Sequence, residues 1–253
     1  MTTTLSLQIL SNLANELGDL QKGTDNEERL GPIRSIQSGA LGLQEFKRTI
    51  LIFIILSVIS GSALVYTAFD SLFSKDGLIM LVLGAAAIVA AIKYTVGENA
   101  YGYRGLGDLF VLLFFGLLST AGAYFLMRHQ IPGNIFLPAI AVGFLSTGVL
   151  NLNNMRDIEN DRHYGKRTIP VMIGIRNAKI YHFTLIIGAF LCMTIYALLK
   201  YQHICNLLFL LTLPLFVVHL GKVTCGKGRE LDPQLKFLSI STLIFALTAG
   251  FSI

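Results

Sequence analysis

Seven apolar stretches that contain no Asp, Glu, Lys or Arg constrain the fold of this 253-residue chain more than any other feature. A bilayer core about 30 Å thick is crossed by roughly 20 residues of α-helix, so each stretch is long enough, or nearly so, to cross it. Backbone groups in hydrocarbon must be satisfied within the chain, and the alternating pattern of the shorter strands of a barrel is missing, so these stretches should be helices. They cover residues 49–69, 77–92, 109–127, 130–155, 180–199, 201–221 and 237–253.

Composition and charge placement agree with a membrane protein. Only 14% of the residues are charged, whereas a soluble domain carries about 25%, which excludes most soluble enzyme folds. Seventeen of the 20 Lys and Arg residues lie before residue 49 or in the loops 93–108, 156–179 and 222–236. The positive-inside rule places these four segments in the cytoplasm. We expect one all-α polytopic transmembrane bundle over residues 1–253, in the inner membrane of the cell, with no nucleic-acid partner.

A further helix is predicted at residues 5–18, ahead of the first span. This segment is mildly apolar but contains two asparagines and a glutamate, and it is too short to cross a membrane alone. It lacks the basic region and cleavage site of a signal peptide. We therefore expect it to be the last part of a helix whose beginning lies ahead of Met1.

The most informative polar segment, NLNNMRDIENDRHYGKRT at 151–168, follows directly from a span. If the helix continues, Asn153, Asp157 and Asp161 lie one turn apart on one face. Such oxygen ligands suit Mg²⁺, which takes one or two protein carboxylates and completes its shell with water and substrate phosphate. A solvated loop that only fixes topology is the alternative, but topology requires no carboxylates in helical register at a membrane boundary. Nearby donors for an anionic group are Arg156, Arg162, Lys166 and Arg167.

A similar cluster occurs at 12–39. Asn15 and Asp19 repeat the spacing of Asn153 and Asp157, and Asp25 adds a carboxylate. An ordinary loop explains this cluster alone equally well. Two acidic clusters on one membrane face are, however, what a diphosphate with bridging Mg²⁺ requires, and we expect them to face each other across a cavity. The cations of this cluster are Lys22, Arg29 and Arg34.

A third polar segment, YTVGENAYGYRGLGDLF at 94–110, belongs to the same side of the membrane. Its glycines permit close backbone approach, its tyrosines offer aromatic faces, and Arg104 and Asp108 carry one charge of each sign. Ordinary turn chemistry would also explain the glycines.

Three motifs together carry a family resemblance. RLGPIRSIQSG, YGYRGLGD and NNMRDIENDRHYGKRT resemble, in this order, signatures of the UbiA superfamily of membrane prenyltransferases, and of its MenA branch. The resemblance runs from Leu7 to the last span. It implies a nine-helix bundle with a central cavity, so the first family helix would be missing from this chain. Glu16 departs from the pattern, because the family has aspartate there.

The resemblance implies roles for the matching residues. Asp19, Asp157 and Asp161 would be catalytic. The metal ligands would be Asn15, Asp19, Asp25, Asn153, Asp157 and Asp161. The substrate-binding residues would be Asn15, Lys22, Arg29, Arg34, Tyr103, Arg104, Asn154, Arg156, Lys166 and Arg167.

The resemblance also implies a reaction. With Mg²⁺ as cofactor, a polyprenyl group would pass from its diphosphate to 1,4-dihydroxy-2-naphthoate with loss of pyrophosphate and CO₂, giving demethylmenaquinol in menaquinone biosynthesis. The ring of Tyr103 would stabilise the allylic cation, and exclusion of water by the lipid-facing cavity would protect it. No spacing argument chooses among Arg104, Arg156 and Asp108 for the residue that binds the carboxylate of the acceptor or takes its phenolic proton.

Two alternatives stay open. A prenyltransferase for another aromatic acceptor, such as 4-hydroxybenzoate or homogentisate, would share the aspartate motifs. A cation transporter would also combine carboxylates with many spans, but transporters place ionisable groups near the bilayer midplane, and the charges here stop at the ends of the spans. His182 and His219 are interpreted as boundary or packing residues.

Overall fold

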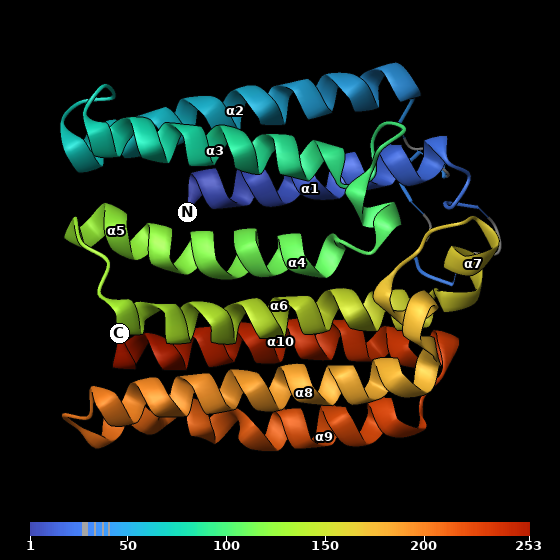
Figure 1. Ribbon diagram of the computed structural model, residues 1–253. Coiled ribbons are helices and arrows are strands. Elements are labelled where there is room, and N and C mark those ends of the chain that lie inside the picture. Colours follow the sequence, from blue (N-terminus) through green and yellow to red (C-terminus); the bar gives the residue numbers. More distant parts are fainter. Residues whose placement is uncertain (27–29, 33, 37, 40) are drawn as a thin grey trace. The chain divides into compact units, whose positions relative to one another are not determined.

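The computed structural model describes residues 1–26, 30–32, 34–36, 38, 39 and 41–253 (Figure 1). Seven helical stretches of this described chain are long and apolar enough to cross a membrane, which confirms the predicted all-α polytopic fold. They extend over Leu43–Phe69, Lys75–Lys93, Gly107–Arg128, Gly133–Arg156, Ile169–Leu199, Ile204–Cys225 and Gly228–Ser252. The chain forms two compact units, the first made of Met1–Leu106 with His163–Lys166 and the second of Gly107–Arg162 with Arg167–Ile253.

The first unit is built on three helices that pack against one another and run side by side (Figure 1). These helices are α1 (Thr2–Gln21), α2 (Leu43–Phe69) and α3 (Lys75–Lys93), and a 3₁₀ turn, η1 (Tyr101–Arg104), follows them. The start of α3 is capped by the Ser74 hydroxyl, which accepts the Gly77 N–H at 3.0 Å. The carboxylate of Glu45 in the same way accepts the Gly42 N–H at 3.1 Å and caps α2.

Helix α1 confirms the predicted N-terminal helix and extends it at both ends. Ser6, Leu10, Ala14 and Leu17 are buried at intervals of three or four residues, the period of a helix that buries one face. At Gly18 a Cβ atom would lie only 2.4 Å from Oγ1 of Thr95, so the close approach to the segment after α3 requires glycine. The polar end of α1 is thereby fixed.

The second unit surrounds α6, which packs against α8, η2 and α10. The Cβ atom of an alanine at Gly116 in η2 would lie 2.5 Å from Cα of Gly143 in α6, so these backbones touch through glycine. The elements are α4 (Gly107–Val111), the π-helical η2 (Leu112–Gly122), α5 (Ala123–Arg128), η3 (Gly133–Ile135), α6 (Phe136–Arg156), α7 (Ile158–His163), α8 (Ile169–Leu199), η4 (Ile204–Thr212), α9 (Leu213–Cys225), η5 (Gly228–Leu231), α10 (Asp232–Ala249) and η6 (Gly250–Ser252).

The core of the second unit combines aromatic packing with one buried polar chain. The rings of Phe190 and Phe245 lie 5.2 Å apart between centroids, in an edge-to-face arrangement typical of aromatic pairs. His182 and His219 are fully buried, and their Nε2 atoms lie 2.9 Å apart. Nδ1 of His219 is 3.1 Å from the side-chain oxygen of Gln234, so the chain of hydrogen bonds joins α8, α9 and α10. The two histidines are packing residues, as the sequence indicated.

Helix α8 begins earlier than predicted. The charge-free run starts at residue 180, but α8 starts at Ile169 and is interrupted only at Gly174, whose φ of 78° no other residue adopts easily. The predicted span at 180–199 lies within α8, and the helix continues ahead of it because Arg176 and Lys179 are helical. A charged side chain at the end of a span does not end the helix.

Candidate active site

The carboxylate of Asp19, at the end of α1, is the centre of the first polar cluster. Asp19 is only 3% exposed, and the Nζ atom of Lys166 lies 3.1 Å from its Oδ1 and 3.2 Å from its Oδ2. The hydroxyl of Tyr103 donates a hydrogen bond of 2.8 Å to Oδ1. A buried carboxylate is stable only with such partners. Three separate segments of the first unit therefore meet at Asp19.

The ring of Tyr103 lies close to two lysine ammonium groups. Nζ of Lys22 lies 3.8 Å from the ring centroid and Nζ of Lys166 lies 5.2 Å from it, both within cation–π range. The hydroxyl of Tyr103 is also 2.5 Å from Oγ1 of Thr24. Burial, followed by the negative charge of Asp19, raises the pKa of Tyr103 above its ordinary value. Tyr103 therefore remains a hydrogen-bond donor at neutral pH.

The pKa of Lys22 is lower than that of an ordinary lysine. Burial lowers its pKa, and the positive charges of Lys166 and Arg104 lower it further, while the nearby Asp19 carboxylate opposes the change. The positive charges of Lys22 and Lys166 repel each other. An anion that lies beside both ammonium groups would relieve this repulsion.

Asn15, one helical turn before Asp19, has a side-chain oxygen that is buried and accepts no hydrogen bond within the described chain. A buried acceptor without a partner is unusual and points to a ligand, water or ion. The sequence predicted Asn15, Asp19 and Asp25 as ligands of a hard cation, and Asn15 and Asp19 are the oxygen pair of this set on α1. This pair fits Mg²⁺ by the chemistry of its donors.

The loop after α1 contains an internal ion pair and a hydrogen bond to the helix. Nε of Arg34 lies 3.5 Å from Oδ2 of the buried Asp25. The carboxylate of Glu16 accepts the backbone N–H of Ile36 at 3.0 Å. Glu16, which departs from the family pattern, thus ties the loop to α1. The predicted substrate ligand Arg29 lies outside the described residues.

The second polar cluster centres on the guanidinium of Arg156, the last residue of α6. Its Nε and one terminal nitrogen donate to both carboxylate oxygens of Asp157, at 3.0 and 2.6 Å. The same terminal nitrogen donates to the Asn153 amide oxygen at 2.9 Å, and the other donates to Asp232 at 2.6 Å. Arg156 is 2% exposed and Asp157 5%. Among the cationic side chains, only the planar guanidinium of arginine can donate two parallel hydrogen bonds to one carboxylate in this way.

The predicted ladder of Asn153, Asp157 and Asp161 is bent, not straight. Helix α6 ends at Arg156 and α7 begins at Ile158, so the helix does not continue unbroken. The register nevertheless survives, because the N–H of Asp157 bonds to the Asn153 carbonyl at 3.2 Å and the N–H of Asp161 to the Asp157 carbonyl at 2.8 Å. The hydroxyl of Thr168 donates to the buried Asp161 carboxylate at 3.4 Å.

Comparison with known proteins identifies the family. The model of the UbiA prenyltransferase family matches residues 1–243. The chain belongs to the UbiA prenyltransferase family. It is thus a membrane-embedded enzyme that transfers prenyl groups.

Individual relatives of this UbiA prenyltransferase share one printed name. The 1,4-dihydroxy-2-naphthoate octaprenyltransferase of Haemophilus influenzae is 45% identical over 96% of this chain and 79% of its own length. The Escherichia coli protein of that name is 46% identical over 90% of this chain and 72% of its own length. The Mycobacterium tuberculosis protein of that name is 31% identical over 99% of this chain and 82% of its own length.

The remaining predicted residues of this UbiA prenyltransferase lie in varied surroundings. Asn154 is buried, Arg167 is exposed, and Arg104 is exposed and donates to the Asn99 side chain. Within the described residues, no group of three or more His, Cys, Asp and Glu side chains gathers closely enough to hold a metal. The predicted sets contain two aspartates and one asparagine each, so the metal assignment stays a prediction.

Sequence reasoning missed Thr24 and Asp232, which contact Tyr103 and Arg156. Asp232 precedes Pro233 at the start of α10, a position that an ordinary helix start explains fully. Thr24 carries no charge. Neither residue has a spacing signal that could have pointed to its partner.

Proposed function

We propose that this enzyme transfers a polyprenyl group from polyprenyl diphosphate to 1,4-dihydroxy-2-naphthoate, with loss of pyrophosphate and CO₂. The name shared by the three relatives supports the acceptor. The observation that carries the assignment is the buried carboxylate of Asp19, held between Lys166 and Tyr103 beside a second ammonium group. The two ammonium groups suit an anionic leaving group, and the carboxylate suits a metal ion.

Lys22 and Lys166 bind diphosphate oxygens in this proposal. Both ammonium groups lie on the Tyr103 ring, so a diphosphate beside them would make charge-assisted hydrogen bonds to two donors. Binding would also remove their mutual repulsion. Tyr103, protonated at neutral pH, holds the Asp19 carboxylate in place through its hydroxyl.

Asn15 and Asp19 would hold Mg²⁺ in the first unit. The unpartnered buried oxygen of Asn15 supports this assignment. When bound, the metal neutralises charge on the diphosphate oxygens, which makes pyrophosphate a better leaving group. Asp25, the other predicted ligand of this cluster, is held by Arg34 and would contribute from the loop.

Asn153, Asp157 and Asp161 are assigned the same ligand role in the second unit. Arg156 fixes the Asp157 carboxylate through two hydrogen bonds, so its orientation is set before any substrate arrives. Arg156 therefore acts as a positioning residue for Asp157.

The bilayer contributes to this reaction. The isoprenoid tail of the substrate dissolves in hydrocarbon, and the helices expose apolar side chains such as Leu51, Ile59 and Leu247. Exclusion of water protects an allylic cation from hydrolysis. We place the enzyme in the inner membrane with the loops that carry both clusters in the cytoplasm, because these loops hold most of the Lys and Arg residues.

The test is turnover by membranes that contain the chain, followed by mass spectrometry. Wild type, Asp19→Asn, Asp157→Asn and the control Glu98→Gln, an exposed loop residue, are given Mg²⁺, polyprenyl diphosphate and 1,4-dihydroxy-2-naphthoate in parallel with 4-hydroxybenzoate and homogentisate. We expect a prenylated, decarboxylated naphthoquinol from wild type and the control. EDTA should abolish it, and each Asn variant should lose about 100-fold or more. Preference for another phenol would contradict the acceptor, and full activity of either variant would contradict the assignment of its cluster.

A further inference from the structure

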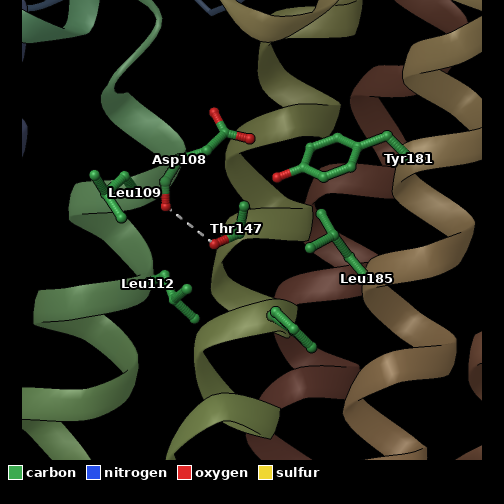
Figure 2. A pocket seen from close by; sticks show the side chains of 7 residues that line it. Asp108, Leu109, Leu112, Thr147, Tyr181 and Leu185 are labelled. Atoms are coloured by element: carbon green, nitrogen blue, oxygen red, sulfur yellow. Dashed lines mark hydrogen bonds between the residues drawn. The ribbon is translucent and has the colours of Figure 1, made fainter.

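A cavity of about 120 Å³ lies in the second unit, apart from the residues assigned to the diphosphate (Figure 2). Its walls come from α4, η2, α6 and α8, all of which belong to that unit. An apolar protein cavity of about 150 Å³ accommodates benzene, so this space suits one aromatic ring of about that size. The lining residues are Asp108, Leu109, Leu112, Phe144, Thr147, Tyr181 and Leu185.

The cavity is apolar except at one end, where three oxygen-bearing side chains meet. Figure 2 shows the ring of Tyr181 directed toward Thr147 and Asp108. Oγ1 of Thr147 lies 3.5 Å from the backbone oxygen of Asp108. The hydroxyl of Tyr181 is close enough to the Asp108 carboxyl for the two groups to interact.

Asp108 is the unusual member of this group. It is 8% exposed, and its Oδ2 atom is buried and accepts no hydrogen bond within the described chain. A buried carboxylate oxygen without a partner is unfavourable unless a ligand completes it. No Lys or Arg is among the described residues that line the cavity, so it offers a diphosphate no cation, whereas a ring hydroxyl can donate to the Asp108 carboxylate.

We propose that this cavity receives the hydroxylated ring of the phenolic acceptor and that Asp108 accepts a proton from its ring hydroxyl. This inference rests on the proposed function for the identity of the acceptor. It chooses among the three residues that the sequence left open. Arg156 is already bound to two carboxylates, and Arg104 is exposed and paired with Asn99, whereas Asp108 is buried and keeps one carboxylate oxygen without a hydrogen-bond partner in the described chain.

The proton that leaves the ring hydroxyl in this step returns to the ring oxygen at its end. The Asp108 carboxylate takes the hydroxyl proton, and the electron pair of the ring forms the new bond to the prenyl carbon. The bond from that carbon to the diphosphate oxygen breaks, and pyrophosphate leaves with the electron pair. Loss of CO₂ from the attacked carbon returns an electron pair to the ring, and protonated Asp108 gives the proton back to the ring oxygen.

Steady-state kinetics of Asp108→Asn test this inference in membranes. Wild type is first assayed with the three phenols named above, and the phenol it prefers is used throughout. For Asp108→Asn we expect kcat to fall about 100-fold or more at pH 7, with the KM for polyprenyl diphosphate unchanged. The residual rate should rise about tenfold per pH unit toward the ionisation of the phenol, whose ordinary pKa is about 10. A merely structural defect would lower the rate equally at every pH. Asp76→Asn, in the first turn of α3, is the control.

Leu185→Phe provides an independent test that leaves the carboxylate in place. The larger side chain fills the cavity and should raise the KM for the acceptor about tenfold, since a displaced ring loses its apolar contacts, while the KM for polyprenyl diphosphate stays unchanged. Should Asp108→Asn misfold, this variant still decides the question.

Wild-type kinetics in Asp108→Asn or Leu185→Phe would overturn the inference even if the proposed acceptor is correct. A raised KM for polyprenyl diphosphate in Leu185→Phe would assign the cavity to the isoprenoid and also overturn it. Prenylation of no phenol by wild type would contradict the proposed function and this inference together.

Discussion

The Nζ atom of Lys166 lies within 3.2 Å of both carboxylate oxygens of Asp19, although 147 residues separate the two in the chain. Both side chains are buried. The short segment His163–Lys166, which begins at the last residue of α7, belongs to the first unit. A segment adjacent to one aspartate motif thus supplies the counterion of the other.

Lys166→Met is expected to weaken the binding of polyprenyl diphosphate. The variant keeps the side-chain length but removes a diphosphate donor and leaves the buried Asp19 carboxylate without its cation. The KM for polyprenyl diphosphate should rise about tenfold or more. Lys47→Met, at an exposed position near the start of α2, should leave it unchanged. An unchanged KM in Lys166→Met would show that Lys166 is only structural.

Lys22→Arg is expected to change the alkaline pH profile. Because the pKa of Lys22 is lowered, its ammonium loses its proton below the pH at which an ordinary lysine does. As the pH rises through that lowered pKa, the positive charge disappears and the KM for polyprenyl diphosphate should rise. Arginine stays charged, so in Lys22→Arg this alkaline rise should be absent. Identical profiles for the two enzymes would contradict a role for the Lys22 charge.

Gly18→Ala is expected to destabilise the first unit. The new Cβ would lie 2.4 Å from Oγ1 of Thr95 and 2.5 Å from its backbone carbon, so the backbone must move. Overpacking of this kind costs about 1–3 kcal/mol, which thermal unfolding in detergent would detect as a lower midpoint. Gly84→Ala on α3 is the matched control, because nothing lies within 4 Å of its Cβ. Equal midpoints for the two variants would contradict the close approach of α1.

Arg156→Met is expected to destabilise the second unit. It leaves the buried Asp157 carboxylate without the guanidinium that binds both of its oxygens, and breaking such a buried pair costs about 3–5 kcal/mol. Arg162→Met is the control. Its exposed partner Glu159 lies 3.0 Å away on the same helix, and an exposed pair contributes under about 1 kcal/mol. A similar unfolding midpoint for both variants would contradict the central position of Arg156.

The sequence predicted the spans well, because charge-free apolar length is a local property. It also predicted the polar ends of α1 and α6, since the Asn-to-Asp spacing is local too. It could not predict that Lys166 pairs with Asp19 or that Asp232 pairs with Arg156, because side chains far apart in the chain meet only through tertiary packing. The break at Gly174 was missed for a different reason, because the sequence around an isolated glycine does not show whether that glycine adopts a positive φ.

The fate of the carboxyl carbon of the acceptor distinguishes prenyl transfer with decarboxylation from any other reaction of this enzyme. Membranes containing the chain receive polyprenyl diphosphate, Mg²⁺ and 1,4-dihydroxy-2-naphthoate labelled in its carboxyl group, and labelled CO₂ and pyrophosphate are measured together. We expect one labelled CO₂ for each pyrophosphate released, with both products absent when Asp19 is replaced by Asn. Pyrophosphate release with the label retained in the naphthoate, or equal CO₂ release by Asp19→Asn, would contradict it.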